Sequence, residues 1–366
     1  MNWFEVKNID RIDSPALLVY RDRVESNIDL AISMRGKVQG LIPHVKTHKM
    51  GEVADLMMDR GIYKFKCATI AEAEMLAIHG AAEVLLAHQP TPPKIQRLVR
   101  LMETYPDASF AAIVDDANIA NLLSDEMESK GRVCQVFIDV DVGMQRTGTP
   151  PENVKPLFEH MLGLKGVQFA GLHVYDGHLR DPDMPSREKA CDECFEPVEQ
   201  LKADIQTTLG RDIRTIAGGS PTFPIHVKRE GVECSPGTFV FWDWGYSQKL
   251  SEQKFDHAAC VITRVISKLG SDKICTDLGH KSIASENPYP RVLFLNRDAG
   301  VQVGHSEEHM VLDVGDNSEY KVGDLLYGIP FHICPTTALY ERAYTVKNQV
   351  ITGYWRIVSR DRKITV

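Results

Sequence analysis

One lysine near the start of the chain stands among basic and imidazole side chains. Lys46 lies within GLIPHVKTHKMGEVADLM (40–57), flanked by His44, His48 and Lys49, where an apolar run ends and a helix-like run begins. Burial and like charge lower the pKa of an amine, and a free amine can attack a carbonyl group. Lys46 is therefore a candidate Schiff-base lysine. The alternative is a solvated lysine at a strand end, because most lysines are exposed.

A second motif has the residue types of an anion-binding turn. The stretch TIAGGSPTF (215–223) contains two glycines and two hydroxyl side chains: Gly218, Gly219, Ser220 and Thr222. Glycines let backbone N–H groups approach an anion closely, and hydroxyls add further donors. Most Gly-Gly-Ser turns only connect two elements. This motif therefore indicates an anion-binding site only in combination with the other motifs.

Two further stretches add an arginine and an aromatic ring. DVDVGMQRTG (139–148) places Arg146 after an apolar run, where its guanidinium can pair with an oxygen anion. GLHVYDGHLR (171–180) places Tyr175 and His178 after another run. A surface arginine and a polar loop histidine are the alternatives for Arg146 and His178.

The elements that must position these side chains form a regular pattern over the first 246 residues. Apolar, β-branched runs alternate with stretches of helical spacing; the runs are 15–20, 40–46, 64–69, 83–88, 110–115, 134–142, 169–177 and 214–220. Such runs indicate parallel strands covered on both faces. Eight strand–helix units fit a closed (β/α)8 TIM barrel of the α/β class. An open doubly wound sheet would usually carry G-x-G-x-x-G after its first strand, and VYRDRVESN does not.

The pattern changes after residue 246. Strand-like runs follow one another through short polar turns without helices between them, which is typical of a mainly antiparallel β domain; they are 257–269, 272–279, 290–296, 309–316, 324–329, 342–348 and 350–360. We expect a barrel domain over 12–246. Residues 247–366, with about residues 1–11, form the β domain.

Composition excludes several classes of function. The chain has 366 residues, 43% of them hydrophobic, and a formal net charge of −8. That charge argues against nucleic-acid and anionic-membrane surfaces, and no apolar run approaches the roughly 18 residues of a bilayer span. The N-terminus lacks the zones of a signal peptide, and the 8 cysteines have no repeating spacing, as expected of free thiols in a reducing compartment. We therefore expect a cytoplasmic enzyme.

In a (β/α)8 barrel the chemistry lies at the carboxyl ends of the strands. Lys46, the 218–222 turn, Arg146 and Tyr175 each follow a predicted strand, so the fold would bring them to one face. An amine, an anion-binding turn, an arginine and an aromatic ring together describe a pyridoxal 5′-phosphate site.

The motif PHVKTHK resembles the cofactor-lysine motif of the D-threonine aldolase and D-serine dehydratase family, fold-type III pyridoxal phosphate enzymes similar to alanine racemase. The resemblance covers nearly the whole chain, through SPALLVY, VGMQRTG, HVYDGH, AGGSPTF, SPGTFVFWDWGY, SEEHMVL and PFHICPTT in order. It implies a pyridoxal phosphate barrel followed by a β domain, usually as a homodimer.

The resemblance also implies roles for individual residues. Lys46 would hold the cofactor, Arg146 would face its phenolic oxygen, and Tyr175 would line it. The phosphate would be held by Gly218, Gly219, Ser220 and Thr222. Tyr246, which closes WDWGY, would lie near the phosphate or the ring, and Gln89 could touch either one.

The motif PFHICPTT supplies an H-x-C pair, His332 and Cys334. In an extended segment, side chains two residues apart point the same way, and imidazole and thiolate suit a borderline divalent metal. By itself such a pair is more often structural. The resemblance implies a divalent metal here, zinc, manganese or cobalt, with open positions for the substrate's oxygens.

The resemblance implies a lyase for D-3-hydroxy amino acids. Aldolases of the family carry aspartate at the second metal position and dehydratases carry cysteine, so Cys334 points to a dehydratase. The C-P-T context and His178 resemble the aldolases, although three residues are missing between Tyr175 and that histidine. We predict retro-aldol cleavage of a D-threonine-like substrate. The alternative is β-elimination from a D-serine- or D-3-hydroxyaspartate-type substrate, and a more remote one is an amino-acid racemase, which needs no metal.

Overall fold

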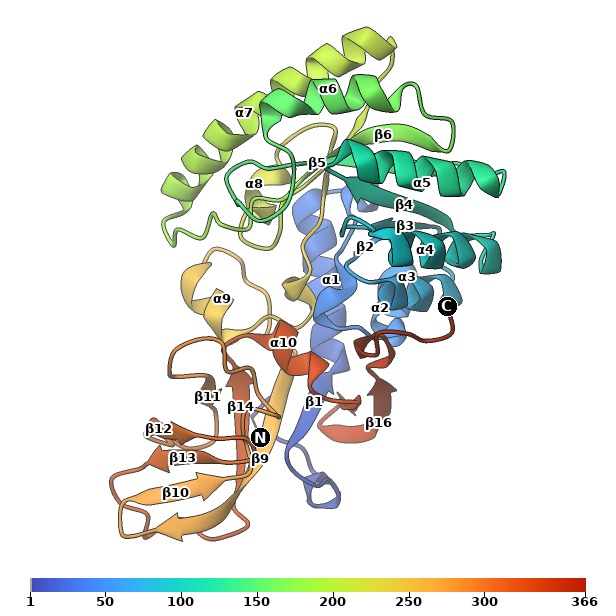
Figure 1. Ribbon diagram of the computed structural model, residues 1–366. Helices are drawn as coiled ribbons and strands as arrows, with labels where there is room; N and C mark the ends of the chain where they lie inside the picture. The colour runs from blue at the N-terminus through green and yellow to red at the C-terminus, as the bar shows by residue number, and fades with distance from the viewer. Residues whose placement is uncertain (1) are drawn as a thin grey trace. The chain divides into compact units, whose positions relative to one another are not determined.

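The structure is a computed structural model that describes residues 2–366 (Figure 1). The chain forms two compact units. The barrel unit comprises 31–46, 51–237 and 361–366, and the β unit comprises 2–30, 47–50 and 238–360. Residues 12–30 and 238–246, which we predicted in the barrel domain, therefore belong to the β unit.

The barrel unit contains a seven-stranded, fully parallel sheet in the described part of the chain, with the order β2-β3-β4-β5-β6-β7-β8. Its strands are β2 (Lys64–Cys67), β3 (Glu83–Leu86), β4 (Ser109–Val114), β5 (Cys134–Val140), β6 (Val167–Val174), β7 (Arg214–Ala217) and β8 (Val232–Cys234). Strand order follows chain order, as in a barrel built from successive strand–helix units.

The extended segment 41–44 joins the two edges of this sheet. Leu41 pairs with Cys234 of β8, and His44 pairs with Lys66 of β2, both in parallel. The backbone N–H of Lys66 also donates to the carbonyl of Pro43 over 2.9 Å. The sheet thus closes on itself, which confirms the predicted (β/α)8 barrel.

The set of eight strands differs from the predicted set at both ends. The run 15–20 is not a barrel strand: β1 (Ala16–Tyr20) pairs with strands of the β unit. The missing barrel strand is β8, which has only three residues with Glu233 in the middle. An apolar run predicts a buried strand but not the sheet that it joins, and so short a strand interrupted by a charge leaves no such run.

Helices alternate with the barrel strands, and α3, α5 and α6 pack directly against them (Figure 1). They are α1 (Arg21–Arg35), inside which the two units divide, α2 (Gly51–Met58), α3 (Ile70–Ile78), α4 (Pro92–Thr104), α5 (Ala117–Ser129), α6 (Pro151–Met161), α7 (Met184–Leu209) and α8 (Phe223–His226). Three begin at side-chain caps: Thr69, Asp116 and Asp183 accept backbone N–H groups of α3, α5 and α7. Inside the barrel lies an apolar cluster of Ile42, Leu85, Ala111, Ile113, Phe137 and Ile216.

Charged side chains cross-link the strands at their amino ends. Arg214, at the start of β7, forms a two-pronged pair with Glu233 (2.7 and 3.0 Å) and also contacts Glu83 (2.6 Å). Lys64, at the start of β2, lies 3.2 Å from Glu233. The ion pairs among these four side chains cross-link β2, β3, β7 and β8.

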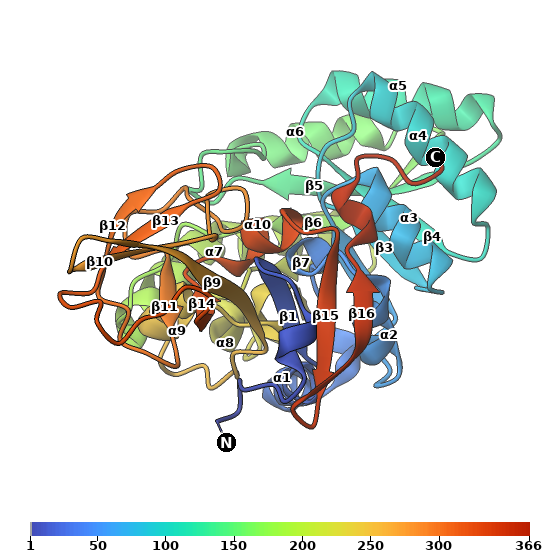
Figure 2. The same ribbon diagram turned by 90° about the horizontal axis from the view of Figure 1, so that it is seen from below.

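The β unit is built on a nine-stranded mixed sheet in the described residues, with the path β12-β13-β10-β9-β1-β15-β16 and with β14 and β11 paired off β9. Its further strands are β9 (Ala259–Leu269), β10 (Lys273–Thr276), β11 (Val292–Phe294), β12 (Val301–His305), β13 (Met310–Asp313), β14 (Leu325–Pro330), β15 (Arg342–Lys347) and β16 (Val350–Arg356). Its pairs are antiparallel except β1–β15, which lie side by side in Figure 2. The predicted, mainly antiparallel domain is confirmed.

Two short helices of the β unit were not predicted, α9 (Trp244–Lys249) and α10 (Ile333–Ala338). The core of the sheet includes Leu18 of β1, Ile262 of β9 and Ile329 of β14. Across residues 2–366, no helix combines the length and the apolar character that a membrane span requires.

We predict that Glu233→Gln destabilises the protein by about 1–3 kcal/mol, because Arg214 and Lys64 lose their shared carboxylate in a mostly buried position. Urea unfolding measures the change. The matched control is Glu128→Gln, whose partner Lys165 is 81% exposed and which should unfold like the wild type. Equal unfolding midpoints for both variants would contradict the proposed cross-link.

Candidate active site

Lys46 follows the segment that closes the barrel. It lies in the 3-10 turn Val45–Thr47, half-buried, and its backbone N–H donates to Nδ1 of His44 over 3.3 Å. We expected His48 to add positive charge nearby. Instead His48 is fully buried, and burial lowers its pKa to about 3, so its imidazole is neutral. Lys66 is a lysine that interacts electrostatically with Lys46.

Lys66 was not singled out in the sequence, where KFKCAT looks like an ordinary strand. Its side chain points from β2 into the barrel and is 2% exposed. Nζ is hydrogen-bonded to the Ser235 hydroxyl, lies 3.4 Å from Nε2 of His173, and sits 5.7 Å from the centre of the Tyr175 ring. Burial, with a further contribution from Lys46, lowers the pKa of Lys66 to about 7.

His173 is held in turn by a buried carboxylate. Its Nδ1 lies 2.6 Å from Oδ1 of Asp139, and both residues are 4% exposed. Burial lowers the pKa of His173 more than the Asp139 carboxylate raises it. A neutral imidazole that donates from Nδ1 to Asp139 presents an unprotonated Nε2 to Lys66.

The 218–222 turn follows β7 and packs tightly against His226 and Tyr175. Gly218 has φ +75°, and a Cβ there would lie 2.6 Å from Cδ2 of His226. At Gly219 a Cβ would lie 3.0 Å from Cε2 of Tyr175. The turn therefore requires glycine for both conformation and space. The Thr222 hydroxyl donates a hydrogen bond to Asp176 over 2.7 Å, and this bond helps to hold the turn in place.

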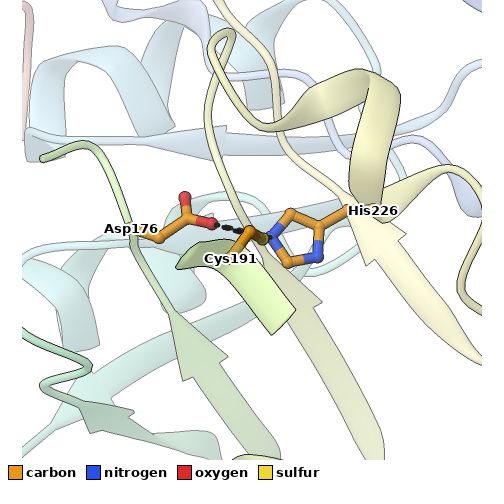
Figure 3. Close-up of side chains that lie close together, drawn as sticks. All are labelled: Asp176, Cys191 and His226. Atoms are coloured by element: carbon orange, nitrogen blue, oxygen red, sulfur yellow. Dashed lines mark hydrogen bonds and ion pairs between the residues drawn. The ribbon is translucent and has the colours of Figure 1, made fainter. Parts of the chain in front are cut away.

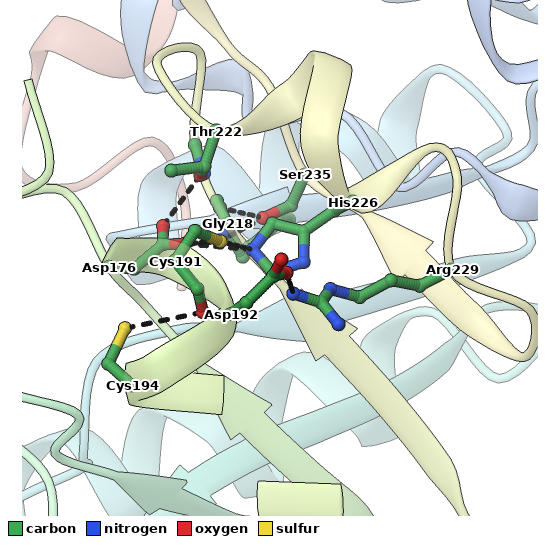
Figure 4. A network of polar contacts seen from close by, with 11 residues as sticks. Asp176, Cys191, Asp192, Cys194, Gly218, Thr222, His226, Arg229 and Ser235 are labelled. Carbon is green, nitrogen blue, oxygen red and sulfur yellow. Dashed lines mark hydrogen bonds and ion pairs between the residues drawn. The ribbon is translucent and has the colours of Figure 1, made fainter. Parts of the chain in front are cut away.

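A buried cluster of Asp176, Cys191 and His226 supports this turn (Figure 3). Oδ2 of Asp176 lies 2.8 Å from Nε2 of His226, and the Cys191 sulfur lies 3.6 Å from each of those atoms. Figure 4 shows how Asp176 reaches both His226 and Thr222. Within residues 2–366, this is the one group of three or more such side chains close enough to share a metal ion.

Burial and hydrogen bonds set the pKa values in this cluster. Burial raises the pKa of Asp176, but hydrogen bonds from His226 and Thr222 outweigh it and leave the pKa lowered. Burial and the Asp176 carboxylate raise the pKa of the Cys191 thiol, which therefore stays protonated. Cys191 is fully buried, and Cys194 is half-buried.

The remaining predicted residues of the barrel lie in its loops. The exposed Arg146 places its guanidinium 5.0 Å from the centre of the half-buried Tyr175 ring. His178 is exposed, and its Nε2 would lie 3.2 Å from a Cβ on Gly143, in the loop that carries Arg146. Oε1 of Gln89 accepts the Asp115 N–H over 2.7 Å, which ties the ends of β3 and β4 together.

These residues fit pyridoxal phosphate. His226, Thr222 and Tyr175 pack so closely on Gly218 and Gly219 that no side chain fits at either position. A turn without side chains leaves its backbone unshielded, as close approach of a phosphate requires. The Tyr175 ring lies near Nζ of Lys66 and the guanidinium of Arg146, and Lys46 offers an amine. Lys66 is buried, and the contacts described above include no carboxylate bonded to its Nζ. The donor set suits a phosphorylated aromatic aldehyde.

In the β unit, His332 and Cys334 lie at the start of α10. His332 is the N-cap of the helix and has an extended backbone, but Ile333 and Cys334 are already helical, so the predicted extended segment does not continue to Cys334. The two side chains still interact: burial lowers the pKa of His332, but the hydrogen bond and charge of Cys334 outweigh it and raise the pKa to about 9. Nδ1 of His332 lies 2.5 Å from Oε1 of Glu286, and the Cys334 sulfur lies 3.1 Å from the Thr47 hydroxyl.

This donor set fits a divalent metal. A metal-binding histidine typically gives its second ring nitrogen to a carboxylate, and Glu286 occupies that position on Nδ1. A thiol next to the imidazole adds a ligand that zinc accepts. His332 and Cys334 form a pair rather than a complete ligand set.

Asp243, which the sequence did not single out, anchors this region. Its carboxylate accepts the N–H of Tyr246 at the start of α9 (2.9 Å) and the N–H of Ile333 at the start of α10 (3.1 Å). Burial raises the pKa of Asp243 to about 6. Tyr246 itself lies on α9, with its ring centre 5.6 Å from that of Trp242. The carboxylate fixes the helix start that carries His332.

We predict that Gly218→Ala weakens binding of pyridoxal phosphate by about tenfold or more, because the methyl group must displace His226 and Thr222 from the turn. Titration of the apoprotein with the cofactor, followed by visible absorbance, measures the loss. Gly80→Ala is the control: Gly80 also has a positive φ, +87°, but no atom lies within 4 Å of its added Cβ. If both variants bind the cofactor equally well, the turn is not the phosphate site.

Comparison with known proteins agrees with this geometry. The chain is 25% identical to a D-threonine aldolase of Arthrobacter sp over 96% of this chain and 93% of that protein. The D-threonine aldolase structure from Filomicrobium marinum superposes with a TM-score of 0.88 at 24% identity, covering 97% of each chain. A D-threo-3-hydroxyaspartate dehydratase from Delftia sp. HT23 gives a TM-score of 0.82 at 22% identity, covering 94% of this chain and 97% of that one.

Two known domains account for most of the sequence. Residues 258–346 match a putative serine dehydratase domain, and residues 19–243 match the N-terminal domain of alanine racemase. The resemblance found in the sequence is thereby confirmed. Because the match of residues 19–243 spans more than half of the chain, the protein belongs to the alanine racemase N-terminal domain family.

Proposed function

We propose that the protein is a pyridoxal phosphate- and divalent-metal-dependent lyase that cleaves D-threonine-like D-3-hydroxy amino acids to glycine and an aldehyde. The observation that carries the proposal is the juxtaposition, within the barrel unit, of two lysines, the Tyr175 ring and the Gly218–Thr222 turn. The similarity to a D-threonine aldolase along 96% of the chain supports the choice of reaction.

The residues of the barrel would divide the work. Pyridoxal phosphate held at Lys46 would supply an electron sink for the bond that breaks at Cα. The 218–222 turn would bind the phosphate, and Arg146, beside Tyr175, would neutralise the phenolic oxygen. His178, exposed in the adjoining loop, is our candidate for taking the proton of the β-hydroxyl group.

The metal would be held by His332 and Cys334, with Glu286 orienting the imidazole and Asp243 fixing the start of α10. It would supply a Lewis acid for the substrate's oxygens. The proposal includes a homodimer, which the family resemblance implies, and a cytoplasmic location, which the sequence composition and N-terminus indicate.

A second candidate is a dehydratase that releases a 2-oxo acid and ammonia. It is favoured by Cys334, which stands beside His332 where the aldolases of the family carry aspartate. The similarity to a D-threo-3-hydroxyaspartate dehydratase supports the same reading. In that reaction the Lys46 amine, rather than His178, would take the decisive proton, from Cα.

We expect incubation of the metal-loaded protein with D-threonine to yield glycine and acetaldehyde. Product analysis with D-threonine, D-serine, D-3-hydroxyaspartate and their L-forms measures this. Formation of 2-oxo acid and ammonia from the D-substrates would replace the aldolase by the dehydratase. Interconversion of D- and L-forms without cleavage would instead indicate a racemase.

We predict that Lys46→Arg lowers kcat/KM on the order of a thousandfold or more, because a guanidinium cannot replace the nucleophilic amine. Lys49→Arg, three residues away, is the control and should retain activity. Borohydride reduction followed by peptide mass analysis should label Lys46 in the wild type. An unlabelled Lys46 peptide from an active, cofactor-loaded protein would disprove its role.

We predict that chelation abolishes activity and that His332→Ala weakens metal binding by about a hundredfold or more. Metal content after dialysis against graded free zinc or manganese measures the affinity. His309→Ala, a change at an exposed histidine, should bind metal as the wild type does. Full activity of the metal-free protein would refute the metal requirement.

A further inference from the structure

The proposed function assigns no role of its own to Lys66, a buried ionisable group. Lys66 is 2% exposed, and the side chains in contact with its Nζ are Ser235, His173 and the Tyr175 ring. Burying an ammonium group is costly unless a negative partner compensates it. The side chains touching Nζ are a hydroxyl, an imidazole and an aromatic ring, so that partner must come from farther away or from a ligand.

The hydrogen-bond directions around Lys66 can be assigned from its neighbours. The Ser235 hydroxyl donates its one hydrogen to the carbonyl of Gly218 over 2.8 Å, so its oxygen accepts from Lys66. His173 donates from Nδ1 to Asp139, so its Nε2 also accepts from Lys66. Lys66 therefore only donates, and two hydrogens are enough. The neutral amine and the ammonium form both satisfy this arrangement.

The charges that face Lys66 come from four neighbouring segments of the barrel. Positive charge comes from Lys46 and Arg146, and negative charge from Asp139 and Asp176. The negative charges are partly committed, since Asp139 pairs with His173 and Asp176 with His226. Burial dominates this balance and holds the pKa of Lys66 at about 7, so near neutral pH the amine is divided between its two forms.

We propose that Lys66 is an additional positioning residue of the cofactor site, whose buried amine takes up a proton when a phosphorylated ligand binds at the 218–222 turn. The inference rests on the proposed function for the identity of that ligand. The connection is direct, because one side chain, Ser235, links Nζ of Lys66 to the carbonyl of Gly218 (Figure 4 shows the Ser235–Gly218 bond).

The physical cause is the charge of the ligand. A phosphate group carries close to two negative charges above its second pKa of about 6, and a nearby anion favours the charged form of an amine. The proton comes from solvent, and binding then becomes linked to pH. Without a ligand, burial disfavours the positive charge on Lys66, and a bound phosphate favours it. The hydrogen bonds from Lys66 to Ser235 and from Ser235 to Gly218 are kept in both forms.

Pyridoxine 5′-phosphate is the probe of choice, because it has the ring and phosphate of the cofactor but an alcohol in place of the aldehyde. Calorimetric titration of the apoprotein at about pH 8, in buffers of different ionisation enthalpy, gives the number of protons taken up. We expect about one proton per ligand for the wild type and close to none for Lys66→Met and Lys66→Arg. Lys64→Met, which removes a charge from the same strand, should behave as the wild type.

The affinity itself gives a second readout. Wild-type binding should weaken by up to about tenfold per pH unit above pH 7, whereas Lys66→Arg, which stays charged, should keep its affinity. Without ligand, the unfolded chain binds more protons than the native one between about pH 7 and pH 10, because the lowered pKa of Lys66 returns to its usual value. The apoprotein's Tm should therefore rise with pH across this window, and less so in Lys66→Met.

The outcomes separate this inference from the proposed function. Ligand binding without proton uptake, or equal uptake in Lys66→Met, overturns the role of Lys66 while leaving the lyase untouched. Proton uptake that depends on Lys66, in a protein that cleaves none of the tested amino acids, supports the role of Lys66 and overturns the lyase. Absence of any binding of pyridoxine 5′-phosphate or pyridoxal phosphate overturns both.

Discussion

The barrel depends on one short extended segment that hydrogen-bonds to both edges of the parallel sheet. Residues 41–44 pair with Cys234 on one side and Lys66 on the other, so no strand edge of the parallel sheet stays open there. This closure also sets the chemistry. It brings Lys46, which follows at once, into the electrostatic range of Lys66, and it places Ser235 against both Lys66 and the 218–222 turn.

A buried polar layer beneath the turn makes that arrangement rigid. Asp176 holds both Thr222 and His226, and Asp139 fixes the tautomer of His173. Such groups are expensive to bury singly but stabilise a unique geometry when each is hydrogen-bonded. The donor atoms of Asp176, Cys191 and His226 lie close enough to share a metal ion. The same cluster supports the turn through the hydrogen bonds of Asp176 to Thr222 and His226.

The β unit uses a different device for the same purpose. Asp243 caps α9 and accepts the first N–H of α10, which fixes the helix start where His332 and Cys334 stand. A buried carboxylate with two backbone donors thus orients the two candidate ligands. One side chain, Asp243, thus orients the start of α10, although no sequence motif identifies it.

The sequence by itself determined the barrel and the antiparallel character of the second unit, because periodicity is a local property. It also singled out Lys46, Arg146, Tyr175 and the glycine turn as candidate site residues, because residue type and spacing are local as well. It misassigned β1, missed β8, and expected charge from His48, because pairing partners and burial depend on distant residues. Lys66, Asp243 and the Asp176 cluster were decided only by tertiary structure. The properties of these side chains depend on burial away from solvent and on contacts with residues far away in the sequence. A short stretch of sequence contains neither kind of information.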